Sequence, residues 1–226
     1  MSINTRTYSR YSTDVSVKLL NNLIKFSNEP SVYKEIMIGI GHFLGDILND
    51  KISPLSKCLI ASTAEDADFL AKGVIDSLAF NHDTFTAVFW NNHYSIDGGS
   101  VAPIVHKYLQ SGFEDADSLI VVKSIISGSC VVRTNILSLI ERLNVKKIYI
   151  VAPVMHIKSE DSLRSEFPSE IFNLFDFIYL AEDSEKDKFG EIKPGIGGQI
   201  YQLLGMLDQP VKTGFVPNIV KQLVGM

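Results

Sequence analysis

Apolar and polar residues alternate along this chain with two different periods. Segments 15–24 and 36–47 place apolar side chains three or four residues apart, as amphipathic helices do. From residue 57 onward, short apolar runs alternate with further helical patterns. These runs are KCLIAS (57–62), TFTAVFW (84–90), SLIVV (118–122), KIYIVAPV (147–154) and FDFIYLA (175–181). The alternation predicts an α/β fold with a mostly parallel, doubly wound sheet of about five strands and flanking helices.

The length of 226 residues fits a single domain spanning 1–226. Within it we expect an N-terminal arm and helix (1–30) and a C-terminal extension (206–226). The apolar first helix and the extension pack either on their own domain or on a second copy. A homodimer is therefore a hypothesis, since twofold dimers are the commonest oligomers.

Charge and composition narrow the classes of partner. A net charge of -5 gives no general attraction for nucleic acid or anionic lipid. No apolar run reaches the roughly 18 residues of a membrane span, and the first residues lack the apolar core of a signal peptide. Cys58 and Cys130 lie in or beside apolar runs and do not suggest a disulfide framework. We expect a cytoplasmic protein that acts on a small molecule, without nucleic-acid or membrane partners.

The segment 118–143 carries the clearest chemical signal. An apolar strand leads through Ser127, Gly128 and Ser129 directly into a helical pattern. Backbone N–H groups at such a bend gather where the helix dipole is positive, which suits a phosphate. The alternative is a small-residue bend that serves only tight packing. The residues expected to bind phosphate are Ile126, Ser127, Gly128, Ser129 and Cys130, called here the 126–130 loop.

This region resembles the uracil phosphoribosyltransferases, which are type I phosphoribosyltransferases. Their phosphate-binding pattern, D-P-M-L-A-T-G-G-S, aligns with residues 122–130 without a gap. NVKKIYIVAPV (144–154) is similar to their G-V-K-K-I…A-A-P-E-G run, and GEIKPGIGGQIYQLLG (190–205) to their base-binding stretch. The resemblance covers residues 30–205. It implies the type I fold, a phosphoribosyl pyrophosphate or nucleoside monophosphate ligand, and transfer of phosphoribose to a base, with uracil favoured.

The resemblance also assigns the remaining loops. It places ribose at Val122 and Lys123, and a substrate-covering arm at residues 91–113. The pyrophosphate loop corresponds to Ser62, Thr63, Ala64 and Glu65. The base-binding loop, called here the 193–198 loop, corresponds to Lys193, Pro194, Gly195, Ile196, Gly197 and Gly198.

Three departures from the family pattern affect the chemistry. In the family, acidic residues accept hydrogen bonds from the ribose hydroxyls. Here Val122 and Lys123 stand in their place, and neither side chain accepts a hydrogen bond. Lys123 could instead contact phosphate or reach solvent. The acids of Thr63-Ala64-Glu65-Asp66 repel pyrophosphate unless Mg²⁺ lies between them. In the 193–198 loop and beyond, family acids are replaced by Gly198 and Tyr201.

Mg²⁺ is therefore a possible cofactor, held by Glu65, Asp66 or Asp68. In the alternative reading, Thr63 and Asp66 form a near capping box, and the acids only stabilise the first turn of a helix. No spacing among the five histidines and two cysteines predicts a zinc site. His93, in the arm, is either a general acid–base group or a solvated loop residue.

These residues are consistent with two functions. The chain either transfers phosphoribose from phosphoribosyl pyrophosphate to a base, or it is a non-catalytic descendant. The descendant would be a nucleotide sensor or a protein-interaction module on the same scaffold.

Overall fold

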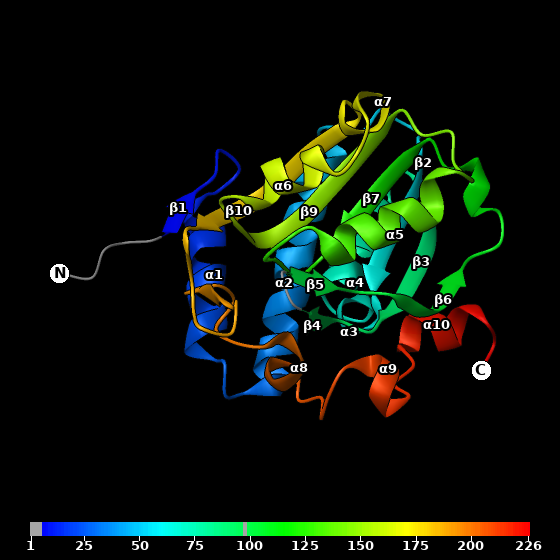
Figure 1. The fold of residues 1–226 in the computed structure, drawn as a ribbon. Coiled ribbons are helices and arrows are strands. Elements are labelled where there is room, and N and C mark those ends of the chain that lie inside the picture. Colours follow the sequence, from blue (N-terminus) through cyan, green and yellow to red (C-terminus); the bar gives the residue numbers. More distant parts are fainter. Residues whose placement is uncertain (1–5, 97–98) are drawn as a thin grey trace.

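The computed structural model describes residues 6–96 and 99–226, which are arranged around one twisted sheet (Figure 1). The strand order is β1-β10-β9-β7-β2-β3-β6, and β8 pairs with β9 beside this path. The strands are β1 (Arg6–Tyr8), β2 (Lys57–Thr63), β3 (Asp83–Asn91), β6 (Ile104–Leu109), β7 (Ser118–Val122), β8 (Ile125–Ile126), β9 (Lys147–His156) and β10 (Phe175–Asp183). The five apolar runs form β2, β3, β7, β9 and β10, which are all parallel. The predicted mostly parallel α/β sheet is confirmed.

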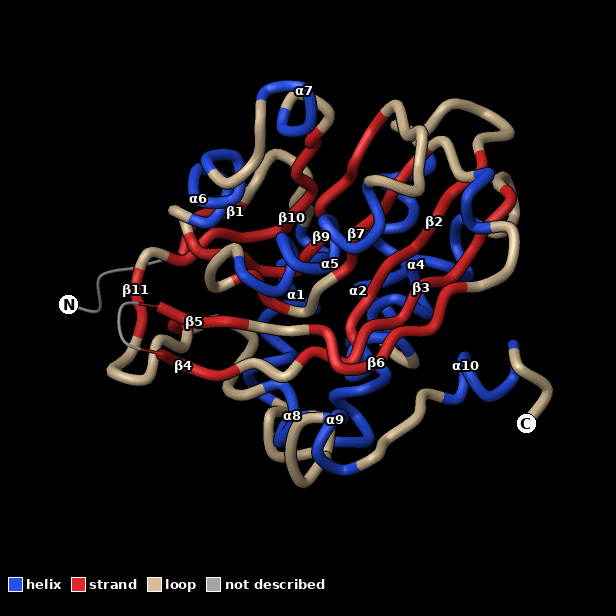
Figure 2. Tube along the Cα trace, turned by 45° about the vertical axis from the view of Figure 1, so that its right-hand side comes forward, coloured by secondary structure: helices blue, strands red, loops and turns tan. Residues whose placement is uncertain are grey.

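Helices cover both faces of the sheet (Figures 1 and 2). The first face carries α1 (Asp14–Lys25), α2 (Pro30–Asn49) and α4 (Leu70–Leu78); the second carries α5 (Cys130–Ile140), α6 (Ser159–Ser165) and α7 (Ser169–Phe172). Along β2, Cys58 and Ile60 join the core of the first face, while Leu59 and Ala61 join that of the second. A parallel strand buried on both faces needs this uninterrupted apolar sequence.

The two edges of the sheet are antiparallel. β1 pairs with β10 and β6 pairs with β3, each in antiparallel register. The sequence pattern predicted neither strand, because most of their side chains are exposed or half-buried and carry no apolar run. The segment predicted to be an arm, residues 91–113, contains the last residue of β3, the antiparallel pair β4 (Tyr94–Ile96) and β5 (Gly99–Val101), and β6. Residues 97–98, which include Gly98 of the predicted arm, lie outside the described residues.

Short elements lie between and after the main strands and helices. They are α3 (Ala64–Ala67), the 3-10 turn η1 (Phe113–Asp115), β11 (Glu185–Lys186), β12 (Ile192–Lys193), α8 (Ile200–Leu203), α9 (Pro210–Thr213) and α10 (Asn218–Leu223). None of the helices in residues 6–96 and 99–226 combines the length and apolar character of a membrane span.

The C-terminal extension packs on its own domain. Trp90 donates its indole N–H to the carbonyl oxygen of Phe215 at 2.7 Å. The carboxylate of Asp68 accepts the backbone N–H groups of Asn218 and Ile219 at 2.8 and 2.9 Å, so it caps α10. Asp68 therefore holds the tail in this structure, while the homodimer stays a hypothesis.

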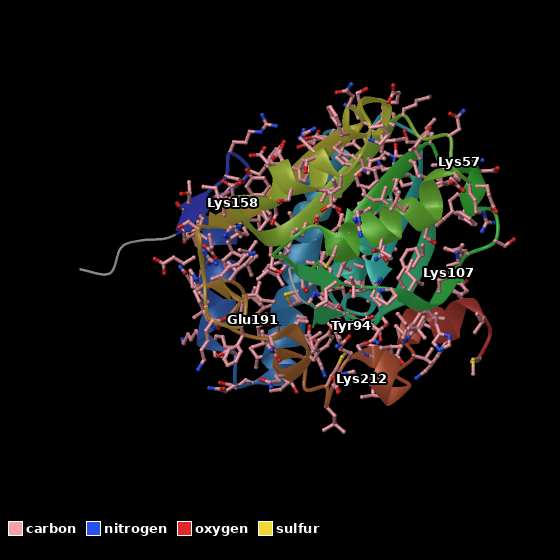
Figure 3. All side chains as sticks on the ribbon, in the orientation of Figure 1. Lys57, Tyr94, Lys107, Lys158, Glu191 and Lys212 are labelled. Atoms are coloured by element: carbon pink, nitrogen blue, oxygen red, sulfur yellow. The ribbon has the colours of Figure 1, made fainter. Side chains whose placement is uncertain are left out.

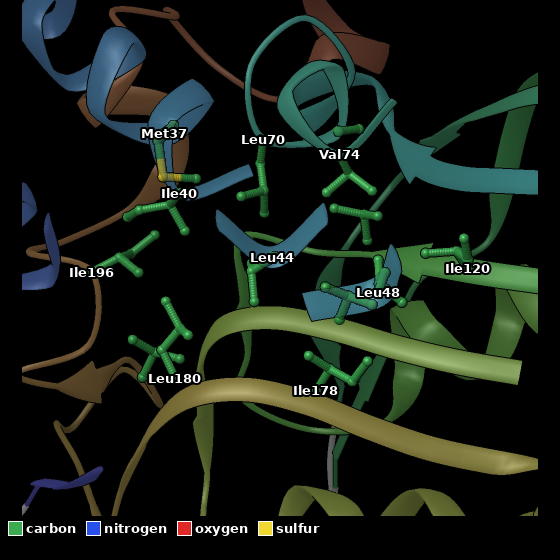
Figure 4. Packing of buried hydrophobic residues seen from close by; sticks show 14 of the residues in the cluster. Met37, Ile40, Leu44, Leu48, Leu70, Val74, Ile120, Ile178, Leu180 and Ile196 are labelled. Carbon is green, nitrogen blue, oxygen red and sulfur yellow. The ribbon is translucent and has the colours of Figure 1, made fainter. Parts of the chain in front are cut away.

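Helix α2 is the centre of the first core (Figure 4). Its buried residues Met37, Ile40, Leu44 and Leu48 pack with α4 on one side and with the strands on the other. The contact between α2 and α4 is close because glycines meet there: a Cβ atom at Gly41 would lie 2.2 Å from the carbonyl oxygen of Leu70. The backbone of α4 occupies that space and has no flexible side chain to yield.

We expect Gly41→Ala to destabilise the protein by about 1–3 kcal/mol or more, since overpacking a rigid contact forces the helices apart. Gly39→Ala is the matched control on the same helix, because only the Leu19 side chain comes within 4.0 Å of its added Cβ. That control should be neutral or stabilise by about 0.5–1 kcal/mol through helix propensity. Chemical denaturation measures both; equal effects would contradict the close packing of α2 on α4.

Candidate functional site

The strand order reverses between β2 and β7. From β2 the chain moves outward to β3, whereas from β7 it moves the other way to β9 and β10. The carboxyl ends of β2 and β7 therefore lie side by side at a topological switch point. Open α/β sheets bind their ligands at this position. The residues that follow these two strands, from Ala64 and from Lys123, are the first candidates for a site.

Here a buried ion cluster joins the two strand ends. The ammonium nitrogen of Lys123 lies 2.6 Å from Asp66 Oδ2 and 3.2 Å from Glu65 Oε1. Asp66 Oδ2 also accepts the Thr63 hydroxyl at 2.9 Å and the Ser124 backbone N–H at 3.2 Å. We call Lys123, Glu65 and Asp66 the lysine–carboxylate cluster.

The cluster is buried, and its two carboxylates stabilise the charged form of Lys123. The Asp66 side chain is fully buried, and the Glu65 and Lys123 side chains are 7% and 10% exposed. Burial alone lowers the pKa of Lys123, but the charges of Asp66 and then Glu65 outweigh it, so the pKa is raised. Lys123 is thus held as an ammonium ion. It neither reaches solvent nor stands free for a phosphate in this structure.

This arrangement determines where the predicted ribose and pyrophosphate residues lie. Val122 is a core side chain, and Lys123 belongs to the cluster. The four residues of the predicted pyrophosphate loop are all buried, namely Ser62, Thr63, Ala64 and Glu65. The near capping box also differs in detail: Thr63 bonds to the Asp66 carboxylate and makes no side-chain cap on α3. These residues contact one another across the strand ends, and both assignments stay predictions.

The 126–130 loop joins the sheet to α5 as the sequence predicted. β8 pairs with β9, and Ser127, Gly128 and Ser129 then lead into α5 at Cys130. Gly128 is exposed, and a Cβ atom there would meet nothing within 4 Å. Ile126 differs from its neighbours, because its side chain is buried in the second core and only its backbone belongs to the bend.

An open cleft of about 340 Å³ lies beside the loop, at the N-terminus of α5. It is lined by Gly99, Ser100, Gly128, Ser129, Cys130, Arg133, Ser162, Ser165 and Glu166, and we call it the α5 cleft. The first N–H groups of an α-helix have no partner within the helix, and its dipole favours an anion there. Serine hydroxyls and a guanidinium add further hydrogen-bond donors to the cleft.

One of the protein's own carboxylates already occupies this end of α5. Glu166, which follows α6, accepts the Ser129 hydroxyl and pairs with Arg133 at 3.0 Å between Nη1 and Oε2. The two oxygens of one carboxylate are therefore held by the loop hydroxyl and the guanidinium in the structure itself. Sequence reasoning missed both residues. Arg133 lies four positions after Ser129 on a predicted helix, so the sequence could have indicated it. Glu166 follows a different helix, α6, and nothing in the local sequence links it to Ser129.

The arm contributes to the same cleft. Gly99 and Ser100 of β5 line it, and Ser100 Oγ lies 3.3 Å from the Cys130 sulfur. His93 is fixed beside it, because its backbone N–H and carbonyl both bond to the Gln209 side chain at 2.8 Å. Tyr94, the residue after His93 and the first of β4, marks this part of the arm in Figure 3. The arm thus rests against the N-terminus of α5 and the C-terminal extension.

The 193–198 loop is tied down at a different place. The backbone N–H of Gly195 donates to Asp183 at 2.8 Å, and Asp183 forms a buried ion pair with Arg6 at 2.7 Å. Ile196 is buried, and its carbonyl accepts the Tyr33 hydroxyl at 2.9 Å. Gly197 and Gly198 line a second cleft with Ser27, Asn28, Pro30, Gln199, Gln202 and Leu203. Lys193 is exposed and Pro194 half-buried, and none of the six predicted base-binding residues lines the α5 cleft.

We expect Asp66→Ala to cost about 3–5 kcal/mol of unfolding free energy, because it leaves the Lys123 ammonium buried without its nearest partner. Asp76→Ala is the control: Asp76 also pairs with a lysine, Lys72, at 2.6 Å, but on the exposed side of α4. Surface pairs contribute roughly 0–1 kcal/mol. Urea denaturation separates the two variants, and a cost below about 1 kcal/mol for Asp66→Ala would show that the cluster does not join the strand ends.

Comparison with known proteins identifies the fold. No family model matches the chain, and no curated protein matches it. The AQ2163 protein from Aquifex aeolicus superposes with a TM-score of 0.69 at 11% identity, over 87% of this chain and 97% of that chain.

Two transferases superpose less well. An adenine phosphoribosyltransferase from Trypanosoma brucei, in complex with AMP, pyrophosphate and ribose-5-phosphate, has a TM-score of 0.44 at 12% identity, over 73% of this chain and 69% of that chain. A hypoxanthine phosphoribosyltransferase from Staphylococcus aureus has a TM-score of 0.42 at 13% identity, over 67% and 75%. Neither carries an argument about this chain. The AQ2163 protein and this chain therefore share an α/β fold with a mostly parallel sheet and flanking helices. At 11% identity, this similarity shows the fold alone.

Proposed function

We propose that this protein binds the phosphate of a phosphorylated ribose compound at the 126–130 loop and does not transfer phosphoribose. The ligand is phosphoribosyl pyrophosphate or a nucleoside monophosphate. The observation that carries the proposal is the Glu166 carboxylate at the N-terminus of α5, where Ser129 and Arg133 hold an anion beside the exposed Gly128. A ligand phosphate presents oxygens of the same charge and would replace this carboxylate.

The lysine–carboxylate cluster supports binding without transfer. Displacement of pyrophosphate from ribose needs acceptors for the ribose hydroxyls and positive charge on the leaving diphosphate. At the switch point, Lys123 offers only donors, and these are directed to Glu65, Asp66 and the Ser124 hydroxyl. Of the three residues expected to hold Mg²⁺, Asp68 accepts the backbone N–H groups at the start of α10, and Glu65 and Asp66 are these two carboxylates. Because the Lys123 ammonium already lies within 3.2 Å of both, they do not fit a divalent cation, and the proposed binding is independent of Mg²⁺.

The base is the least determined part of the ligand. The choice of uracil as the base rests only on the resemblance of the 193–198 loop to the base-binding stretch of the uracil phosphoribosyltransferases. Gly195 and Ile196 are buried, so a base would contact Gly197 and Gly198 or the exposed Lys193. This protein is accordingly proposed to be a nucleotide-sensing descendant of a transferase, in which the phosphate site is kept and the reaction site is closed by an internal ion cluster.

Gly128→Glu tests the phosphate site. We expect at least tenfold weaker binding of phosphoribosyl pyrophosphate and uridine monophosphate, about 1.4 kcal/mol, from a carboxylate placed where the anion binds. Gly128→Ala is the control and should bind normally, because its Cβ meets nothing within 4 Å. Calorimetric titration measures both variants. Full affinity in Gly128→Glu, with an unchanged melting temperature, would place the anion elsewhere.

Glu166→Gln tests the competition between the internal carboxylate and the ligand. Removing this negative charge frees Arg133 and Ser129 for the ligand, so the affinity for inorganic phosphate should rise several-fold at low salt. Glu160→Gln is the matched control, because Glu160 pairs with Arg164 within α6 and does not line the cleft. An affinity that stays constant or falls in Glu166→Gln would contradict the proposed replacement of carboxylate by phosphate.

A further inference from the structure

The two cysteines of this chain lie in opposite environments. Cys58 is buried at the start of β2, and its burial, followed by the negative charge of Asp117, raises the pKa of its thiol to about 12. Cys130 is only half-buried, is the first residue of α5 and lines the α5 cleft. A reagent small enough to enter the cleft therefore reaches one thiol and not the other.

Three features favour the charged form of the Cys130 thiol. The positive end of the α5 dipole lies at its backbone. Ser100 Oγ lies 3.3 Å from its sulfur, and the His93 imidazole interacts with it from the arm. Burial raises the pKa of Cys130, but His93, Ser100 and the Val131 backbone N–H together outweigh it, and the pKa is lowered.

His93 is suited to hold the thiol proton. Its interaction with Cys130 raises the pKa of the imidazole, against an opposing effect of partial burial. The charges that face this pair come from several elements. Lys123 lowers and Glu191 raises the pKa of His93, while Arg133 and Glu166 line the cleft beside the sulfur. The backbone bonds from His93 to Gln209 fix the segment that carries the imidazole.

We propose that Cys130 is a nucleophilic thiolate that small electrophiles modify inside the α5 cleft, with His93 holding its proton. With iodoacetamide, the sulfur forms a bond to the methylene carbon, and the carbon–iodine bond breaks with both electrons leaving on iodide. With hydrogen peroxide, the sulfur attacks one oxygen and the oxygen–oxygen bond breaks. Cys130 becomes a sulfenic acid and loses two electrons, while the departing hydroxide takes the His93 proton and leaves as water.

Competitive labelling of the full-length protein with iodoacetamide at pH 7, followed by peptide mass spectrometry, tests this proposal. Cys130 should react at least about tenfold faster than Cys58, and its rate should reach half its maximum at a pH below the roughly 8.5 of an ordinary thiol. In guanidinium chloride both thiols should react alike, since the difference comes from the fold. Equal rates in the native protein, or an ordinary midpoint for Cys130, would overturn the proposal.

His93→Gln separates the imidazole from the other features of the cleft. This variant should label several-fold more slowly at pH 7, and its midpoint should move to higher pH, because the thiolate loses its partner. His106→Gln is the control, since His106 is exposed on β6. An unmoved midpoint in a folded His93→Gln protein would refute the role of His93.

The reactivity of Cys130 in the ligand-free protein does not rest on the proposed phosphate site. Inorganic phosphate should slow the labelling of Cys130 if the anion occupies the α5 cleft. Fast labelling without this protection would overturn the proposed phosphate site and support the reactive thiol, whereas slow labelling with intact phosphate binding would do the reverse.

Discussion

The Lys123 ammonium lies 2.6 Å from Asp66 and 3.2 Å from Glu65, and this buried interaction connects the two strand ends where the sheet changes direction. Charges taken out of water are stable only when each has a close partner of opposite sign. Removal of Lys123 would leave two carboxylates facing each other in the interior, and removal of Asp66 would take the nearest partner from the Lys123 ammonium. The cluster therefore fixes the turn after β2 and the bend after β7 relative to each other, and a ligand at the switch point would have to break it.

The α5 cleft is organised in a different way. Glu166 and Arg133 are 28% and 41% exposed, so their pairing is screened and easily exchanged for a ligand. We propose that the pair at the end of α5 exchanges with ligand, whereas the buried lysine–carboxylate cluster stays closed. Cys130 lies at the boundary of the α5 cleft, beneath the arm. A covalent change at its sulfur would alter the cleft without disturbing the cluster.

The sequence predicted the parts of the fold that repeat a strong local pattern. The strands β2, β3, β7, β9 and β10 are continuous apolar runs, and the bend into α5 follows directly from Ser127-Gly128-Ser129. It did not predict β1 or β6, because edge strands with exposed side chains lack a distinct pattern. Lys123 and Asp66 are 57 positions apart, so nothing local indicates their pairing. The same holds for Arg133 with Glu166 and for His93 with Gln209. Side-chain pairing across elements is set by the tertiary fold, so the motif alignment could not indicate that Lys123 pairs with Asp66 and Glu65.

We propose that this protein keeps a phosphate site while its reaction site is closed. The most direct measurement mixes the purified protein with phosphoribosyl pyrophosphate, Mg²⁺ and uracil, and follows pyrophosphate release beside calorimetric binding of the same ligand. We predict saturable binding that is lost in Gly128→Glu, and no pyrophosphate release above the uncatalysed background. Turnover that depends on protein concentration and disappears in Gly128→Glu would contradict the account, because it would require the lysine–carboxylate cluster to open for catalysis.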